Sequence, residues 1–163
     1  MRDLIAGVVA LALLVVALSL ATTLRFYRRR RQRTADAERA LGRTIIAEIP
    51  AADDLVLFTE DEHRFYYGEQ SIDKDLIAAV RVLINGAPIA AYVSSKAGSH
   101  ARVQPTSFED RPEGIARDRW DVAIEGLDGT TIVVCGAIRE RVSQELARAV
   151  FDAVKRDVER RDA

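Results

Sequence analysis

Cysteine, histidine and lysine are scarce in this chain. Its 163 residues include one cysteine and two histidines, and its basic residues are 21 arginines but only three lysines. The single cysteine, Cys135, excludes an intramolecular disulfide and any multi-cysteine zinc or iron–sulfur site. Because Cys135 lies in an apolar run, we expect a small core side chain and not a nucleophile.

Motifs for catalysis and metal binding are missing as well. Gly126 and Gly129 are typical of a turn, not of a phosphate-binding loop. His63 and His100 lie 37 residues apart, and the acidic stretches 60–63 and 73–75 provide few ligands for a metal. We therefore predict no catalytic residue, no cofactor and no metal, and keep an enzyme of unknown type only as the third alternative.

Charge is divided unevenly along the chain. Residues 1–43 carry a net charge of +6, and residues 44–163 carry a net charge of −7. Phosphate affinity depends on clustered lysine and arginine, so the acidic carboxy-terminal part is not expected to bind nucleic acid.

A run of 21 uncharged residues, 4–24, lies between Asp3 and Arg25. As a helix it would span roughly 31 Å, which is close to the thickness of a bilayer's hydrocarbon core. Phe26 and Tyr27 would then lie at headgroup depth, where aromatic rings are enriched. The run predicts a transmembrane helix over 4–24 that follows an external amino terminus, 1–3.

Six arginines occupy nine positions directly after this run: Arg25, Arg28, Arg29, Arg30, Arg31 and Arg33. Positive flanks stay on the cytoplasmic side of a membrane, so the cluster predicts a single-pass protein of the cell membrane. Its amino terminus would be outside and its carboxy-terminal domain would be cytoplasmic. Residues 25–43 would form a polybasic juxtamembrane stalk, and the arginines would also attract anionic lipid at the bilayer surface.

One alternative and one additional property remain for the amino-terminal segment. The small residues of "SLA", 19–21, are typical of a signal-peptide cleavage site, so the chain is also consistent with an exported cell-envelope domain cleaved near Ala21. Small residues four apart at Ala6/Ala10 and Ala17/Ala21 are compatible with helix packing and self-association.

Alternating apolar and polar residues predict a β-rich domain over 44–163. Three hairpins are expected, over 55–68, 79–93 and 119–136, with a further strand at 44–49. Asn85-Gly86 fits the two-residue turn of the second hairpin. Trp120, Val122 and Ile124 share one face of their strand, which we expect to be buried.

A long polar connection and a helix complete the domain. Residues 94–118 are rich in glycine, proline, serine and charge; we expect a flexible connection, with a short strand near 101–103 as the alternative. Apolar residues every four positions predict an amphipathic helix over about 138–160. Its apolar stripe contains Val142, Leu146, Val150, Val154 and Val158.

Strands in hairpins followed by one carboxy-terminal helix resemble a pleckstrin-homology-like (PH-like) domain over about 44–160, and residues 55–82 look like the opening of its bacterial members. The resemblance implies an α+β fold in which a helix caps an antiparallel split β-barrel. Lipid-binding members carry basic residues in the first hairpin loop, where this chain has Glu60, Asp61 and Glu62, which would repel a phosphate. The resemblance therefore implies a binding or scaffolding module that recognises a protein partner near the inner membrane surface. The sequence identifies neither that partner nor the oligomeric state.

Overall fold

The computed structural model describes residues 2–51, 55–95 and 119–163; side chains of the first helix are described from Leu11 on, with gaps at 12, 21, 23, 24, 27 and 28. The chain forms two compact units, Met1–Leu41 and Gly42–Ala163, and the second is called the head below. The first unit is the helix α1, Arg2–Ala40. Gly42 follows its end with a φ of 76°, a conformation that glycine adopts readily and that terminates helices.

The structure contradicts the predicted transmembrane helix. In the described part of the chain, no helix is both long and apolar enough to cross a membrane. This finding also overturns the single-pass placement, with the amino terminus outside and the carboxy-terminal domain cytoplasmic.

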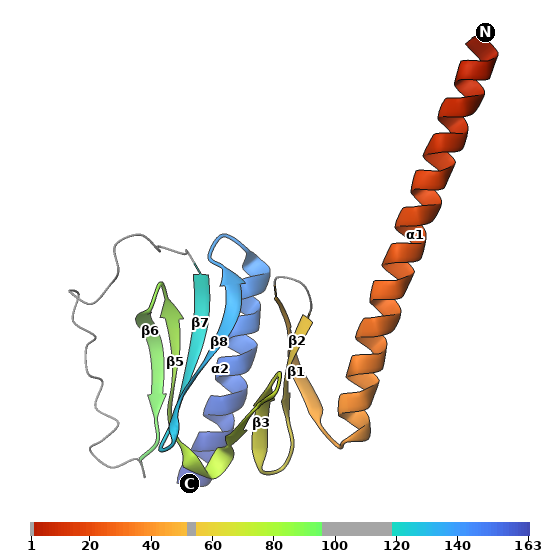
Figure 1. Cartoon of the computed structure of the whole chain (residues 1–163). Helices are drawn as coiled ribbons and strands as arrows, with labels where there is room; N and C mark the ends of the chain where they lie inside the picture. Colours follow the sequence, from red (N-terminus) through yellow and green to blue (C-terminus); the bar gives the residue numbers. More distant parts are fainter. Residues whose placement is uncertain (1, 52–54, 96–118) are drawn as a thin grey trace. The chain divides into compact units, whose positions relative to one another are not determined.

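The head begins with a four-stranded antiparallel sheet, sheet A, in the order β1-β2-β3-β4 (Figure 1). Its strands are β1 (Thr44–Pro50), β2 (Leu55–Glu60), β3 (Arg64–Tyr67) and β4 (Gln70–Asp73). A bulge between Ile45 and Ala47 changes the register of β1 against β2. Strand alternation places Ala47 and Ile49 in the core, and because of the bulge the adjacent Ile46 also packs against it.

A one-turn 3₁₀ helix, η1 (Lys74–Leu76), leads from β4 into the second sheet, sheet B. Sheet B has the order β6-β5-β7-β8, so β6 and β8 are its edges. Its strands are β5 (Ile77–Ile84), β6 (Ala87–Val93), β7 (Arg119–Gly126) and β8 (Gly129–Ala137). Asn85 and Gly86 both have positive φ, which confirms the predicted two-residue turn between β5 and β6.

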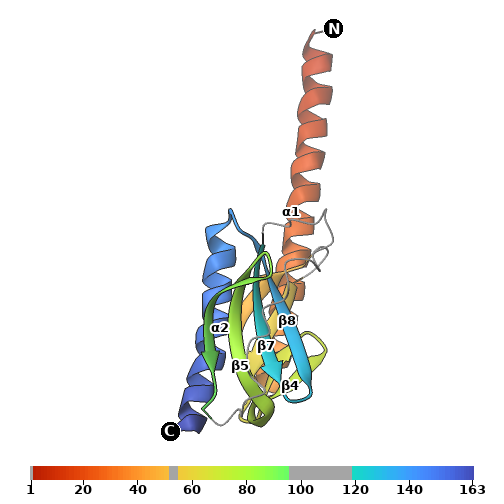
Figure 2. The same ribbon diagram turned by 90° about the vertical axis from the view of Figure 1, so that its left-hand side faces the viewer.

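One helix, α2 (Arg141–Asp162), packs along sheet B and also contacts β1 (Figures 1 and 2). Its buried face contributes Ala147, Val150, Val154 and Val158 to a single core that includes side chains from every strand except the edge strand β6. The largest fully buried side chains of this core are Phe58 and Phe65, whose rings stack 5.6 Å apart.

The predicted split β-barrel is wrong, although the α+β class is correct. Among the described strands no ladder joins β4 to β5 or β1 to β8, so they form two sheets and no closed barrel. Each sheet therefore has two edge strands, whose outward backbone hydrogen-bonding groups are not paired within the sheet. The three predicted hairpins and the first strand are present, while β4 and η1 were not predicted.

Two further expectations need correction. Val142 lies in the first turn of α2 and is 60% exposed, so the apolar stripe begins at Leu146. On β7 the expected face is buried at Val122 and Ile124, but Asp121 and Ala123 on the opposite face are buried too. The proposed strand near 101–103 lies outside the described residues.

Replacing Gly136 with alanine is expected to destabilise the head by about 1–3 kcal/mol. Gly136 has a φ of 119°, and a Cβ there would lie 2.5 Å from Ser143 Oγ on α2. The measurement is the urea unfolding midpoint, followed by fluorescence of Trp120. Adding Ser143→Ala should restore the part of the lost stability that the collision causes. If the double variant were no more stable than Gly136→Ala alone, the close approach of β8 to α2 would be contradicted.

Candidate functional site

The arginine cluster lies on α1. The side chains of Arg25, Arg29, Arg30, Arg31 and Arg33 are exposed, as is Phe26, whereas Arg28 and Tyr27 have side chains outside the described set. The predicted role of these residues at a membrane surface depended on the span that the structure contradicts, and no described contact tests it. The head therefore supplies the candidate sites.

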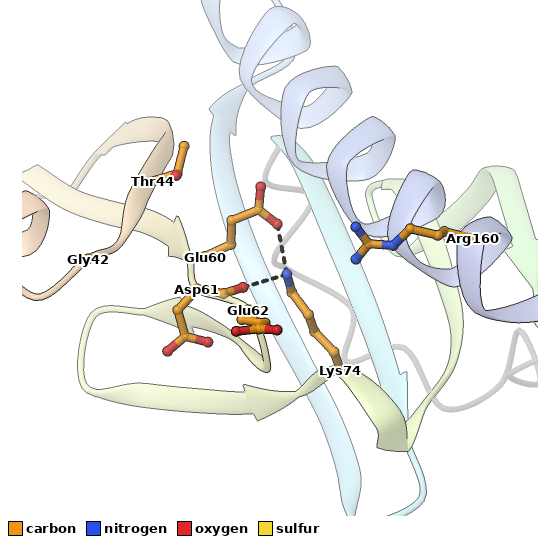
Figure 3. A pocket seen from close by; sticks show the side chains of 7 residues that line it. All are labelled: Gly42, Thr44, Glu60, Asp61, Glu62, Lys74 and Arg160. Carbon is orange, nitrogen blue, oxygen red and sulfur yellow. Dashed lines mark hydrogen bonds and ion pairs between the residues drawn. The ribbon is translucent and has the colours of Figure 1, made fainter.

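The first candidate is a polar hollow of about 280 Å³ at the end of the head where α2 terminates (Figure 3). It lies between the start of β1, the β2–β3 turn, η1 and the last turns of α2. Its lining residues are Gly42, Thr44, Glu60, Asp61, Glu62, Lys74 and Arg160.

Lys74 is the buried charge of this hollow, with only 5% of its surface exposed. Its Nζ lies 3.0 Å from Glu60 Oε2 and donates to the backbone oxygen of Asp61 at 2.7 Å (Figure 3). It also lies 3.8 Å from Asp157 Oδ1 and 4.6 Å from the centre of the Phe65 ring. An ammonium group has three donors, so these contacts leave Lys74 little capacity for a ligand.

Asp157 extends the same network into α2. It is 5% exposed, and its carboxylate pairs with Arg160 at 2.5 Å and with Arg161 at 2.9 Å. Breaking a buried ion pair leaves an uncompensated charge, which is costly. The network therefore fixes the carboxy-terminal end of α2 to η1 and to the end of β2.

The carboxylate of Asp61 is also occupied by its own turn. It accepts from the backbone N–H of His63 and of Arg64, and from the hydroxyl of Tyr66 at 2.6 Å. The Tyr66 hydroxyl is the largest cause of a pKa for Asp61 below its usual value of 3.8. Most of the polar groups that line the hollow are therefore engaged in contacts that stabilise the fold.

The second candidate is an apolar groove of about 240 Å³ between α2 and strands β5, β6 and β7 of sheet B. We call it the β6–α2 groove. Its lining residues are Val82, Ile89, Ala90, Trp120, Gln144, Ala147, Arg148, Phe151 and Asp152. Ile89 is 55% exposed, and Trp120 and Phe151 are half-buried at the border of the core. Exposed apolar surface next to aromatic side chains is typical of binding surfaces.

Contacts between α2 and β6 are concentrated at the carboxy-terminal end of β6. Tyr92 Oη and Ser94 Oγ reach Asp162 at 3.4 Å and 2.7 Å, which attaches the end of α2 to the end of β6. Lys155 lies 5.8 Å from the centre of the Tyr92 ring. Because α2 touches β6 chiefly at this end, the middle of β6 stays uncovered beside Arg148 and Phe151.

Two ion pairs lie on the face of sheet B that is turned away from α2. Arg81 is buried and pairs with Glu125 at 2.6 Å, and Arg119 pairs with the buried Asp121 at 2.8 Å. The second oxygen of Asp121, Oδ1, has no hydrogen-bond partner. Burial raises the pKa of Asp121 above its usual 3.8, and the pair with Arg119 opposes that rise.

Cys135 is buried in the core, as the sequence indicates. Burial, with a smaller contribution from Asp121, raises the pKa of its thiol to about 12. A thiol at that pKa is protonated at neutral pH and therefore a poor nucleophile. In the described part of the chain no group of histidine, cysteine, aspartate and glutamate side chains is arranged to hold a metal.

Comparison of the chain with protein-family models, with curated proteins and with solved structures found no match. The resemblance to PH-like domains consequently stays a prediction. The residues that form the groove were not identified from the sequence as a site, because β6 and α2 are separated by about fifty residues. A buried Lys74 was also missed, since a lone lysine between two aspartates reads as exposed.

Lys74→Met is expected to destabilise the head by about 3–5 kcal/mol, because it leaves Glu60 and Asp157 without their shared cation in a buried site. The urea unfolding midpoint measures this loss. Glu60→Gln added to the same variant should recover part of it, since the amide needs no counter-charge. A loss below about 1 kcal/mol would place Lys74 in solvent and contradict the network.

Asp121→Asn is expected to stabilise the head at neutral pH by about 1 kcal/mol, because it removes a buried charge that has one unsatisfied oxygen. The folded-state pKa of Asp121 is raised, so its contribution to stability is present at low pH and is lost as pH rises through that pKa. Between about pH 4 and pH 7, the unfolding midpoint should therefore fall less steeply with rising pH in the variant than in the wild type. Asp152→Asn, an exposed control on α2, should leave the wild-type profile unchanged.

Proposed function

We propose that the head is a protein-binding module and that the β6–α2 groove receives an apolar side chain of an extended segment of another protein. The observation that carries the proposal is the exposed Ile89 beside the half-buried rings of Trp120 and Phe151 in one groove. A concave apolar site with a few polar groups at its border is the usual form of a binding pocket.

The groove fits a protein segment better than the polar hollow fits a small molecule. In the hollow, Lys74, Glu60 and Asp61 are engaged in contacts that stabilise the fold. In the groove, the side chains of Ile89 and Ala90 are exposed. No described side-chain hydrogen bond or ion pair to α2 depends on them. The β6–α2 groove, at about 240 Å³, has room for one large side chain, which would act as the anchor of a longer segment.

Charge at the border of the groove favours an acidic residue next to this anchor. Arg148 is exposed and forms no ion pair with any described residue. Asp152 is the other charged lining residue, so the lining is neutral overall. Lys155 lies two turns further along α2, outside the groove, and pairs with Glu159 at 3.6 Å, so the expected preference rests on Arg148 alone. An acidic side chain in the partner would pair with Arg148 and contribute to specificity.

The test is selection of short random peptides displayed on phage against the whole purified chain, followed by fluorescence anisotropy with the selected peptides. Ile89→Arg should weaken binding about tenfold or more, because it places a charge in the apolar site. Leu127→Arg is the matched control: Leu127 is 75% exposed in the β7–β8 turn, outside the groove. Failure to select any peptide, or equal loss in both variants, would overturn the proposal.

Charge reversal tests the acidic residue separately. Arg148→Glu should weaken peptides that carry an acidic residue beside the apolar anchor by about five- to tenfold, and changing that residue to lysine should restore binding. Arg156→Glu, an exposed change on α2 outside the groove, should have little effect. Equal affinity of acidic and basic peptides for the wild-type chain would show that the border does not discriminate.

A further inference from the structure

The backbone of β6 has a defined open edge. The backbone N–H of Ser94 donates to the carbonyl of Ala78 in β5 at 2.8 Å. Alternate residues of an antiparallel strand direct both backbone groups to the same neighbour. Tyr92 and Ala90, which pair with Val80 and Val82, therefore point to β5. The N–H and C=O groups of Ala91 and Val93 point away from sheet B.

Among the described residues, the other three sheet edges are protected, whereas the second half of β6 is not. The edge strand β1 carries Glu48, Pro50 and a bulge, and β4 has only four residues and ends at Asp73. The edge strand β8 lies beside β1. Charges, prolines, bulges and short strands are the devices that keep edges from pairing.

On β6 such devices are confined to its first half. The register shift lies at Ile89, which has no partner on β5, and Pro88 has no N–H to donate. From Ala90 to Val93 the strand has no charge, proline or bulge, and no described strand pairs with its outer edge. This half of β6 also runs along the β6–α2 groove, since Ala90 lines it.

We propose that the segment bound in the β6–α2 groove adds to sheet B as a further strand, with hydrogen bonds to the outward backbone groups of Ala91 and Val93. This inference rests on the proposed function and specifies how that partner binds. Side chains of an added strand would alternate between the α2 side and the opposite side, as those of β6 do. One side chain on the α2 side would enter the groove between Ile89 and Phe151.

A helical partner fits the same surface less well. A helix is about 10 Å across and satisfies its own backbone groups, so it would leave Ala91 and Val93 without new partners. An extended segment satisfies them and needs only one side chain to fill the groove. The two modes differ in which amides of β6 become protected on binding.

Amide hydrogen exchange of the whole chain, followed by NMR, tests the open edge without any ligand. We expect the amides of Ala91 and Val93 to exchange at least about tenfold faster than those of Ala90 and Tyr92, whose N–H groups face β5. Slow exchange at all four amides would show that the edge is already covered and would overturn the inference.

Ala91→Pro tests the same edge through binding of the selected peptides. It removes an outward N–H, and proline is tolerated at such positions of edge strands. We expect an unchanged unfolding midpoint and binding weakened about tenfold. Ala90→Pro is the matched control: it removes a bond of the β5–β6 ladder and should lower the midpoint.

N-methylation of the selected peptides, one backbone nitrogen at a time, separates the binding modes on the wild-type chain. An added strand predicts loss of affinity at alternate positions only, together with protection of the Ala91 and Val93 amides. Loss without alternation, or no protection of those amides, would overturn strand addition while leaving the groove as the binding site. If no peptide binds at all, the proposed function fails instead.

Discussion

The fold of the head depends on α2, because two sheets that share no backbone ladder need a common apolar surface to pack against. Val150, Val154 and Val158 are fully buried and meet side chains from both sheets. A sheet with one apolar face is stable only when that face is covered, and one helix of 22 residues covers the inner faces here. The same requirement explains why the helix is amphipathic, with exposed charges along its outer side.

Polar contacts decide where this helix ends, and they also determine where the surface stays open. Asp157 joins α2 to Lys74, and Asp162 joins it to Tyr92 and to Ser94. Both anchors lie in the last two turns. Nearer its start, α2 lies over β7 and β8, close to Gly136, and does not cover the middle of β6. The groove follows from this oblique packing: the helix is fixed to β6 at one end only.

Local patterns in the sequence predict much of this structure and little of the site. Alternation of apolar residues gives the three hairpins, and Asn85-Gly86 gives a turn with positive φ at both positions. These features depend on neighbours within a few residues. Burial of Lys74 depends on Glu60 and Asp157, which lie 14 and 83 positions away, and no local pattern contains that information. The groove is likewise a product of β6 and α2, which meet only in the folded chain.

The failures have equally definite causes. An apolar run and an arginine cluster predicted a membrane span, whereas the described part of the chain contains no helix with the length and hydropathy to cross one. Seven strands and a helix predicted a barrel, but the short β4 and the turn of η1 separate the two sheets instead of joining them. A barrel has no edges, whereas two open sheets have four. Three of these edges are short, interrupted or adjacent to another strand, and the second half of β6 is none of these. Within the described residues, the second half of β6 is therefore an edge whose outward backbone groups pair with no other strand beside an apolar groove. Such an edge invites pairing with another chain, which is the physical basis of the proposed strand addition.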